Sequence, residues 1–156
     1  MVKPRIREAT LRDAGDIRSL LERNGLPTRD LVSSRPEFIV ACAGARIIGA
    51  GALERFGATA LLRSIVVASE ARSAGLGGLI VRELERRARA AGVLEVILLT
   101  ETAESFFRRQ NYHTIGRSGV PAAIQASEEF RSLCPASAHC LSKELTDPGE
   151  PEVGRG

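Results

Sequence analysis

Apolar residues recur at helical spacing in the first part of this chain and then in short strand-like runs. Residues 10–24 predict a helix, with Thr10 placed as its N-cap and Gly25 just past its end. A short strand around Ile6 precedes this helix, and residues 27–31 predict a short second helix or a loop. The apolar positions of the first helix are Leu11, Ala14, Ile17, Leu20 and Leu21.

Three apolar runs follow, at residues 38–42, 46–54 and 61–68, and glycine-containing turns separate them. Tight turns between such runs predict an antiparallel meander. Gly49 and Gly51 lie two residues apart, so they share one face of their strand. They would leave room there for a ligand, or they would mark a bulge.

The second half of the chain alternates between helical and strand patterns. Residues 79–91 predict an amphipathic helix, and residues 95–100 predict a strand parallel to 61–68, which completes a β-α-β unit. The apolar face of the helix is formed by Leu76, Leu79, Ile80, Leu84 and Ala88, and its surface pairs are Glu83 with Arg87 and Glu85 with Arg89. Further helices are predicted at 103–109 and 121–133, and further strands at 112–116 and 138–143.

These patterns describe an α/β chain that forms one domain over residues 1–145, followed by a tail at 146–156 that is predicted to be disordered. The net charge of +3 is too small to argue for nucleic acid, although a pI of about 9.1 suits a polyanionic small molecule. No apolar run follows the N-terminus and none is long enough to span a membrane, so we expect neither a signal peptide nor a membrane partner. Three cysteines, an odd number, predict free thiols in the cytoplasm.

A basic, glycine-rich turn joins the strand at 61–68 to the following helix. Its glycines let the backbone approach a bulky group closely, and the start of a helix offers unpaired N–H groups to an anion. Arg72 adds a fixed positive charge with donors suited to phosphate oxygens. The turn therefore predicts a phosphate-bearing ligand, although it matches neither the dinucleotide nor the nucleoside-triphosphate loop pattern.

The turn matches Arg-x-x-Gly-x-Gly, and with its flanking segments it resembles the GNAT superfamily of acetyl-CoA-dependent N-acetyltransferases over about residues 6–145. The resemblance implies a mixed central sheet of about six to seven strands with a splayed parallel pair and flanking helices. It implies acetyl-CoA as co-substrate, with pantetheine on the backbone of Ile65, Val66 and Val67. The pyrophosphate would lie on the N–H groups of Arg72, Ser73, Ala74, Gly75, Leu76, Gly77 and Gly78.

The family's helix with the pattern Ala-x-x-x-Tyr-x-x-x-Gly-Phe/Tyr maps onto residues 103–112, with two departures. Phe107 stands where many relatives carry the tyrosine that protonates the leaving thiolate, and Asn111 stands at the usual glycine. Thr100 occupies the place of an asparagine that contacts pantetheine in relatives. The usual general acid is therefore absent, and the thiolate would be protonated by solvent.

The Arg63-Ser64 pair and the stretch at 120–140 resemble the ArsN branch, which is associated with arsenic-resistance operons and acetylates arsinothricin. The Arg-Ser pair also resembles short N-acetylglutamate synthases. Both resemblances imply a small amine acceptor that carries a carboxylate, with phosphinothricin as a further candidate. They also imply that a homodimer is a reasonable expectation.

Arg63 lies in an apolar strand, so it is expected either to bind a substrate carboxylate or to form an internal ion pair or face outward. Glu54 ends the apolar run at 46–54, the third predicted strand, where it would act as the general base through water or be a surface glutamate. The amide of Val67 would stabilise the oxyanion. His113 would be a strand residue or take part in proton transfer.

Cys134 and Cys140 lie six residues apart, which invites a trivalent arsenic site or merely two buried thiols. With His139 they offer too few ligands for zinc, so no metal site is predicted. Two alternatives to an acetyltransferase stay open at this point. One is a non-catalytic module that binds acyl-CoA or arsenicals, and the other is a cysteine-based arsenite binder.

Overall fold

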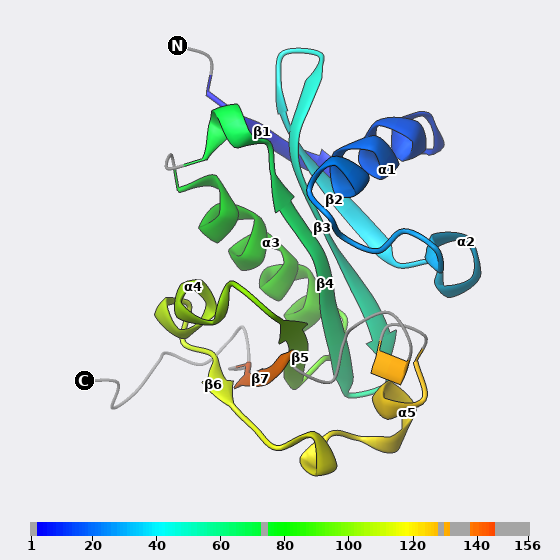
Figure 1. Ribbon diagram of the computed structural model, residues 1–156, viewed down its shortest axis with the longest axis vertical. Helices are drawn as coiled ribbons and strands as arrows, with labels where there is room; N and C mark the ends of the chain where they lie inside the picture. Colours follow the sequence, from blue (N-terminus) through cyan, green and yellow to red (C-terminus); the bar gives the residue numbers. More distant parts are fainter. Residues whose placement is uncertain (1–2, 73–74, 128–129, 132–137, 146–156) are drawn as a thin grey trace. The chain divides into compact units, whose positions relative to one another are not determined.

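The protein forms a seven-stranded mixed sheet with helices packed against it (Figure 1), and the computed structural model describes residues 3–72, 75–127, 130–131 and 138–145. The strand order is β1-β2-β3-β4-β5-β7-β6. The strands are β1 (Arg5–Glu8), β2 (Glu37–Ala43), β3 (Arg46–Phe56), β4 (Thr59–Val67), β5 (Glu95–Thr100), β6 (His113–Thr114) and β7 (His139–Glu144). The α-helices are α1 (Ala14–Arg23), α2 (Leu31–Ser34), α3 (Leu76–Ala90), α4 (Glu104–Arg109) and α5 (Ala122–Gln125). This confirms the predicted α/β class with a mixed sheet.

The chain divides into two compact units. The first takes the residues up to Glu54 together with Leu62–Leu84, and the second takes Arg55–Leu61 and the residues from Glu85 onward. The single domain over 1–145 stays a prediction, and the tail at 146–156 lies outside the described residues.

The first unit contains the predicted antiparallel meander. β1 pairs with β2, and β2 pairs with β3 around a turn in which Gly44 has a φ of 63°. Gly49 and Gly51 face α3, where a Cβ at Gly51 would stand 2.8 Å from Ile80 Cγ2. They therefore make room for α3, which corrects the expectation of space for a ligand.

Two of the predicted helical faces are partly wrong. Leu11 is 96% exposed and Ala14 is exposed, because residues 11–13 form a 3-10 turn and the α-helix begins only at Ala14. On α3, Leu79 is 44% exposed and Val81 is buried in its place. Ile17, Leu20, Leu21, Leu76, Ile80, Leu84 and Ala88 are buried as predicted.

The second unit packs around an apolar cluster of Leu61, Ile97, Val120, Ile124 and Cys140. The first three residues of β4 pair in parallel with β5, from Thr59 opposite Glu95 to Leu61 opposite Ile97. β5 pairs antiparallel with β7, which also pairs with β6. The parallel pair is thus as predicted, and the later residues of β4 belong to the first unit.

Three expectations for the second unit need correction. The strand predicted at 112–116 is present as a strand only over His113–Thr114, and the helix predicted at 121–133 is not continuous: α5 ends at Gln125, Phe130 and Arg131 are helical again, and residues 128–129 and 132–133 lie outside the described residues. The hydroxyl of Ser127 accepts the N–H of Phe130 at 3.3 Å, a local bond that competes with helix continuation. Glu85, expected on the surface, is buried. In the described part of the chain, no helix is both long and apolar enough to cross a membrane.

Candidate functional site

The glycine-rich turn leads into the longest helix of the described residues. Gly75 has a φ of 76°, a left-handed conformation that glycine adopts without a steric penalty, and α3 begins at the next residue. The helix therefore starts inside the predicted anion-binding sequence, with Leu76, Gly77 and Gly78 in its first turn. The first N–H groups of any α-helix have no partner within it, so they are available to an anion. Ser73 and Ala74 lie outside the described residues.

Arg72 is exposed and is tied to two neighbouring segments of the first unit. Its Nε donates to the carbonyl oxygen of Val67 at 3.1 Å, and its Nη2 donates to Oδ1 of Asn24, just past the end of α1. A guanidinium has five N–H donors, so these two bonds leave donors for a phosphate. The predicted phosphate contact is compatible with this geometry and stays a prediction.

The end of β4 holds the three residues expected to meet pantetheine. Val66 is buried, and Ile65 and Val67 are half-buried. Just beyond them, the Ala68 N–H donates to the carbonyl oxygen of Ile48 at 2.8 Å, which ties the end of β4 to β3. The oxyanion role of the Val67 amide stays a prediction.

Ser64 interrupts β4 with a left-handed backbone. Its φ is 58°, which costs a residue with a side chain about 1–2 kcal/mol. Such a residue breaks the two-residue alternation of a strand. The side chains of Arg63 and Ser64 are both buried there, and Arg63 Nε donates to Ser64 Oγ at 3.3 Å.

Arg63 lies at the centre of a buried charge cluster with Asp30 and Glu54. Its Nη1 and Nη2 donate to the two carboxylate oxygens of Asp30 at 2.5 and 2.7 Å. Nη1 also reaches Glu54 Oε1 at 3.3 Å. The Arg63 side chain is 0% exposed and the Glu54 side chain 13%. The internal ion pair, one of the alternatives for Arg63, is therefore the arrangement observed, and Glu54 is not a surface residue.

The two carboxylates of this cluster have pKa values shifted in opposite directions. Burial acts to raise the pKa of Asp30, but hydrogen bonds from Arg63 and Ser34 outweigh it, and the pKa is lowered. Burial raises the pKa of Glu54, and the longer hydrogen bond from Arg63 offsets only part of that rise. Glu54 is thus the carboxylate of the pair that takes up a proton more readily.

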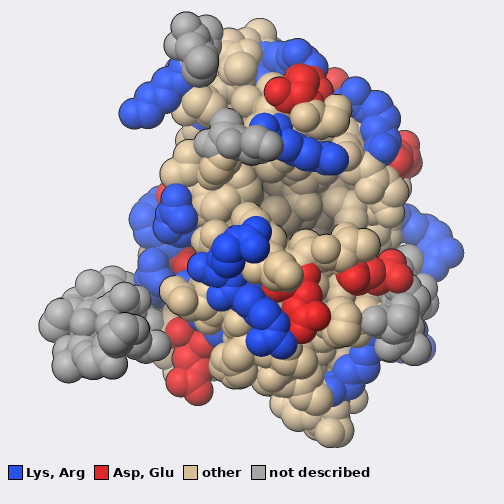
Figure 2. Space-filling model, turned by 60° about the vertical axis from the view of Figure 1, so that its left-hand side comes forward, with Lys and Arg blue, Asp and Glu red and all other residues tan. Residues whose placement is uncertain are grey.

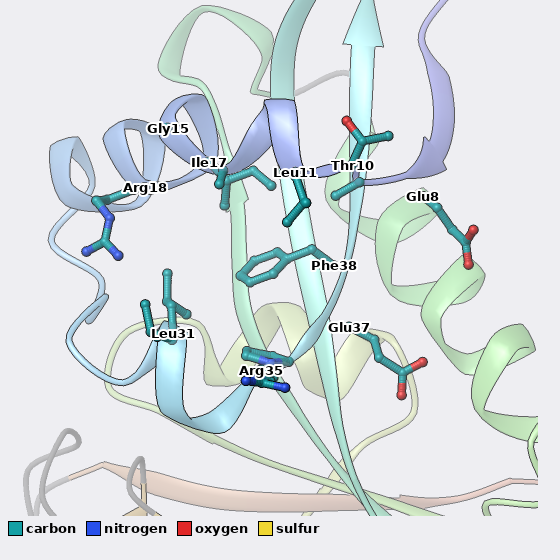
Figure 3. Close-up of a pocket in the computed structure, with 14 residues that line it drawn as sticks. Glu8, Thr10, Leu11, Gly15, Ile17, Arg18, Leu31, Arg35, Glu37 and Phe38 are labelled. Carbon is teal, nitrogen blue, oxygen red and sulfur yellow. The ribbon is translucent and has the colours of Figure 1, made fainter.

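A pocket of about 900 Å³ lies between α1, α2 and the start of β2 in the first unit. Figure 3 shows the Phe38 ring in the middle of its lining, with Leu11, Ile17 and Leu31 around it. Glu8 and Glu37 stand on one side and Arg18 on the other, and Arg35 lies near Leu31. The pocket therefore combines an apolar centre with a rim that carries both signs of charge.

The pocket and Glu54 lie on the same face of the sheet. Phe38 pairs with Ala52 across β2 and β3, and paired residues project to the same face. Glu54 is two residues beyond Ala52, so its side chain projects to that face as well. Gly49 and Gly51 occupy the opposite face, against α3.

In the second unit, Thr100 and Phe107 make local contacts. The Thr100 hydroxyl accepts the N–H of Ala103 at 3.0 Å, just before α4. Phe107 is buried, with its ring edge-on to that of Tyr112 at 5.6 Å between centroids. Asn111 has a φ of 73°, the left-handed conformation expected at that position. The contacts of Thr100 and Phe107 with CoA stay predictions.

A second buried cluster joins Glu85 of α3 to Tyr112 and Lys143. The Tyr112 hydroxyl donates to Glu85 Oε2 at 2.8 Å, and Lys143 Nζ lies 3.0 and 3.1 Å from the two carboxylate oxygens. Burial, followed by the Glu85 charge, raises the pKa of Tyr112 well above its ordinary value. This phenol therefore stays protonated and bound to Glu85.

The thiol and histidine residues do not gather into a site among the described residues. Cys140 is buried, its pKa is raised by burial, and Cys134 lies outside the described residues. His139 is exposed and precedes Cys140 on β7, so the two side chains point to opposite faces. His113 lies in β6, and its Nε2 is 3.4 Å from the Oγ of Ser142, its pairing partner on β7. In the described ranges, no three His, Cys, Asp or Glu side chains are placed to hold a metal ion.

Charged side chains of both signs are interspersed on the face shown in Figure 2. The expectation that the chain has no nucleic-acid partner stays a prediction.

The start of α3 offers N–H groups to an anion, and a buried carboxylate of raised pKa such as Glu54 is suited to accept a proton. Residues 34–114, just over half of the chain, match the family model described as Acetyltransferase (GNAT) domain. The chain belongs to the GNAT acetyltransferase family. It is therefore an N-acetyltransferase of this type, for which acetyl-CoA is the co-substrate.

The chain is similar to a curated protein and to solved structures. It is 29% identical over 125 residues to the uncharacterized N-acetyltransferase YjcF of Bacillus subtilis, covering 73% of this chain and 89% of that protein. N-acetylglutamate synthase from Neisseria gonorrhoeae, complexed with coenzyme A and N-acetyl-glutamate, aligns with a TM-score of 0.80 at 20% identity. The alignment covers 94% of this chain but only 36% of the synthase. Rv2747 from Mycobacterium tuberculosis, in complex with CoA and NLQ, aligns with a TM-score of 0.78 at 23% identity, covering 91% and 99% of the two chains.

These structures support the GNAT fold, and the ArsN branch stays a prediction. The sequence indicated Arg63 and Glu54 as candidate site residues. It did not indicate that Asp30 pairs with Arg63, or that Tyr112 and Lys143 bind Glu85. A buried arginine demands a carboxylate, but nothing in the spacing of Asp30 indicates which acid supplies it. Glu85 did have a signal, because Val81, Glu85 and Ala88 recur at helical spacing on a buried face.

Proposed function

We propose that this N-acetyltransferase acts on the amine of a small, amino-acid-like acceptor that carries a carboxylate. The observation that carries the proposal is the shared sheet face of Glu54 and the pocket under α1 and α2. The apolar centre of the pocket suits a short side chain. Arg18 and Arg35 on its rim suit an acceptor carboxylate, and Glu8 and Glu37 suit an ammonium group.

In the proposed reaction, the neutral amine attacks the thioester carbonyl carbon of acetyl-CoA directly. The amine loses a proton to Glu54 through a water molecule, which its raised pKa favours. The Val67 amide stabilises the oxyanion of the tetrahedral intermediate. The intermediate collapses with cleavage of the C–S bond, and the departing CoA thiolate takes a proton from solvent. Positioning of the two reactants supplies most of the acceleration.

In this proposal the acceptor's carboxylate binds to the rim arginines of the pocket and not to Arg63. A substrate carboxylate would have to displace Asp30, which occupies both Nη groups of a side chain with no exposed surface. The rim arginines of the pocket need no such displacement. Arg35 is exposed, at the end of α2.

Candidate acceptors include glutamate, arsinothricin and phosphinothricin. The resemblance to the ArsN branch and to N-acetylglutamate synthases supports these three, since each joins an amino group to acidic groups. A screen of amines and amino acids that measures CoA thiol release tests the acceptor class. Turnover of acids over matched amides supports the proposal, and equal turnover of both contradicts it. The homodimer is part of the proposal on the family resemblance alone, and sedimentation velocity tests it.

Binding of the co-substrate at the turn is tested by calorimetry with acetyl-CoA. Arg72→Ala removes one charge-assisted contact, and a loss of about 1.5–3 kcal/mol corresponds to roughly tenfold to hundredfold weaker binding. Gly75→Val should weaken binding at least as much. A Cβ at Gly75 meets nothing within 4 Å, so the harm would come from the left-handed φ and from obstruction of the pyrophosphate.

Arg82→Ala, at an exposed position on α3, is the matched control and should leave affinity unchanged. Circular dichroism confirms that each variant is folded. Folded Arg72 and Gly75 variants that bind acetyl-CoA as tightly as the parent would place the co-substrate elsewhere. Binding without thiol release for any acceptor would instead favour the non-catalytic alternative.

A further inference from the structure

The cluster of Asp30, Arg63 and Glu54 holds two carboxylates and one guanidinium in the first unit. Asp30 approaches from the segment before α2, Arg63 from β4 and Glu54 from β3. The guanidinium is shared unequally, with bonds of 2.5 and 2.7 Å to Asp30 and one contact of 3.3 Å to Glu54. One negative charge in the cluster is therefore left without a full counter-charge.

Asp30 is held in this position by more than Arg63. Ser34 Oγ donates to Asp30 Oδ2 at 2.7 Å, and the N–H of Ser34 donates to the Asp30 carbonyl oxygen at 2.8 Å. The Asp30 side chain is 1% exposed. Its carboxylate thus has fixed geometry, whereas Glu54 keeps some access to solvent.

We propose that Asp30 is a positioning residue that claims the Arg63 guanidinium and thereby leaves Glu54 as the carboxylate that takes up the acceptor's proton. This inference deepens the proposed function, because it rests on Glu54 as the base. Without Asp30, Arg63 would turn its Nη groups to Glu54 and hold it as a paired, weakly basic carboxylate.

Glu54 is acted on by charged groups from two neighbouring segments. In the described part of the chain, Arg63 of β4 and Asp30 before α2 are the charged groups that act on Glu54. On its other side, β3 pairs with β2, which presents Phe38 to that face. The Asp30 charge itself also disfavours a second negative charge at Glu54.

The test is a carbon NMR titration of the glutamate side-chain carboxyl groups in the protein alone, with Glu54→Gln used to assign the Glu54 signal. In Asp30→Asn, the midpoint of Glu54 is expected to fall below that of the parent. Two causes act together, since Arg63 becomes available to Glu54 and the Asp30 charge is gone. An unchanged or higher midpoint would overturn the proposal.

Asp30→Asn leaves a buried guanidinium with one partner fewer, so folding is checked by circular dichroism. If it does not fold, the double variant Asp30→Asn/Arg63→Met decides, because it also removes the buried guanidinium that Asp30→Asn leaves with one partner fewer, and Glu54 keeps some access to solvent. Its Glu54 midpoint is expected above that of the parent, since the guanidinium that lowers it is absent. A midpoint at or below the parent's would show that Arg63 does not act on Glu54, and the proposal would fail.

Ser34→Ala is the matched control. It removes a hydrogen bond to Asp30 but keeps both carboxylate charges, so the Glu54 midpoint should stay in place. A purely structural role for Asp30 would lower stability and leave that midpoint unmoved.

The titration needs neither acetyl-CoA nor an acceptor, so it stands even if no turnover is found and the proposed function fails. Where turnover is found, the acidic limb of the kcat/KM profile should move in the same direction as the titration midpoint. An acidic limb that stays in place while the Glu54 midpoint moves would overturn the link between Asp30 and the base.

Discussion

The two buried charge clusters of this protein differ in how their charges balance. In the second unit, one carboxylate, Glu85, receives a hydroxyl and an ammonium, so donors and charge match. In the first unit, two carboxylates share the guanidinium of Arg63, and Glu54 receives only the longer contact. The matched cluster holds each group in one protonation state near neutral pH, whereas the unmatched one leaves Glu54 as a carboxylate that takes up a proton more readily.

The largest expected effect is a loss of activity, and it should follow from a change in the Glu54 cluster. Glu54→Gln should lower kcat by about 10²–10⁴-fold, the usual contribution of a general base. Glu144→Gln, an exposed glutamate at the end of β7, is the control and should have full activity. Steady-state kinetics with a responsive acceptor measures both. If the kcat of Glu54→Gln stays within about threefold of the parent's, the Glu54 cluster has no catalytic role.

The next largest effect is a loss of stability, and it should follow from a change in the Glu85 cluster. Glu85→Ala leaves the Tyr112 hydroxyl and Lys143 without their acceptor, and losing one partner of a buried pair costs about 3–5 kcal/mol. Lys143 is partly exposed and can turn toward water, so we expect the lower end of that range. Urea denaturation gives the free energy of unfolding, with Arg82→Ala as the control on the same helix. A loss under about 1 kcal/mol would mean that this cluster is not a stabilising one.

Tyr112→Phe should cause a smaller loss of stability, and that loss should shrink at alkaline pH. Near neutral pH it removes one buried hydrogen bond to a charged group, at a cost of about 1.5–3 kcal/mol. The pKa of Tyr112 is raised in the folded state, so its contribution is present below about pH 10, the ordinary tyrosine value, and is lost as pH rises above it. The stability difference between variant and parent should therefore shrink in alkaline solution. A pH-independent difference would argue against the raised pKa.

The smallest expected effect is the pH dependence of stability at Glu54. Its pKa is raised in the folded state, so the ionised side chain costs stability above that pKa, and the cost disappears as pH falls. Glu54→Gln should therefore become more stable relative to the parent as pH rises from about 4 toward neutrality. Thermal unfolding across that range measures the trend. The opposite slope would show that Arg63 dominates over burial at Glu54.

The sequence alone was enough for the local elements and for the turn. Apolar periodicity and glycine placement predicted the meander, α3 and the parallel strand β5, because these patterns reflect short-range backbone preferences. Gly75 before α3 was readable for the same reason. The 3-10 turn at residues 11–13 and the early end of α5 were not, since local hydrogen bonds there compete with the helix pattern.

Tertiary structure alone decided the partners of the buried charges. Asp30 and Arg63 are 33 residues apart, and Glu85 and Lys143 are 58 apart, so no local pattern joins them. Only the fold brings Asp30 to both Nη groups of Arg63 and leaves Glu54 with the weaker contact. Burial then sets the direction of each pKa shift, because the cost of a charge depends on the solvent and partners that folding removes or supplies.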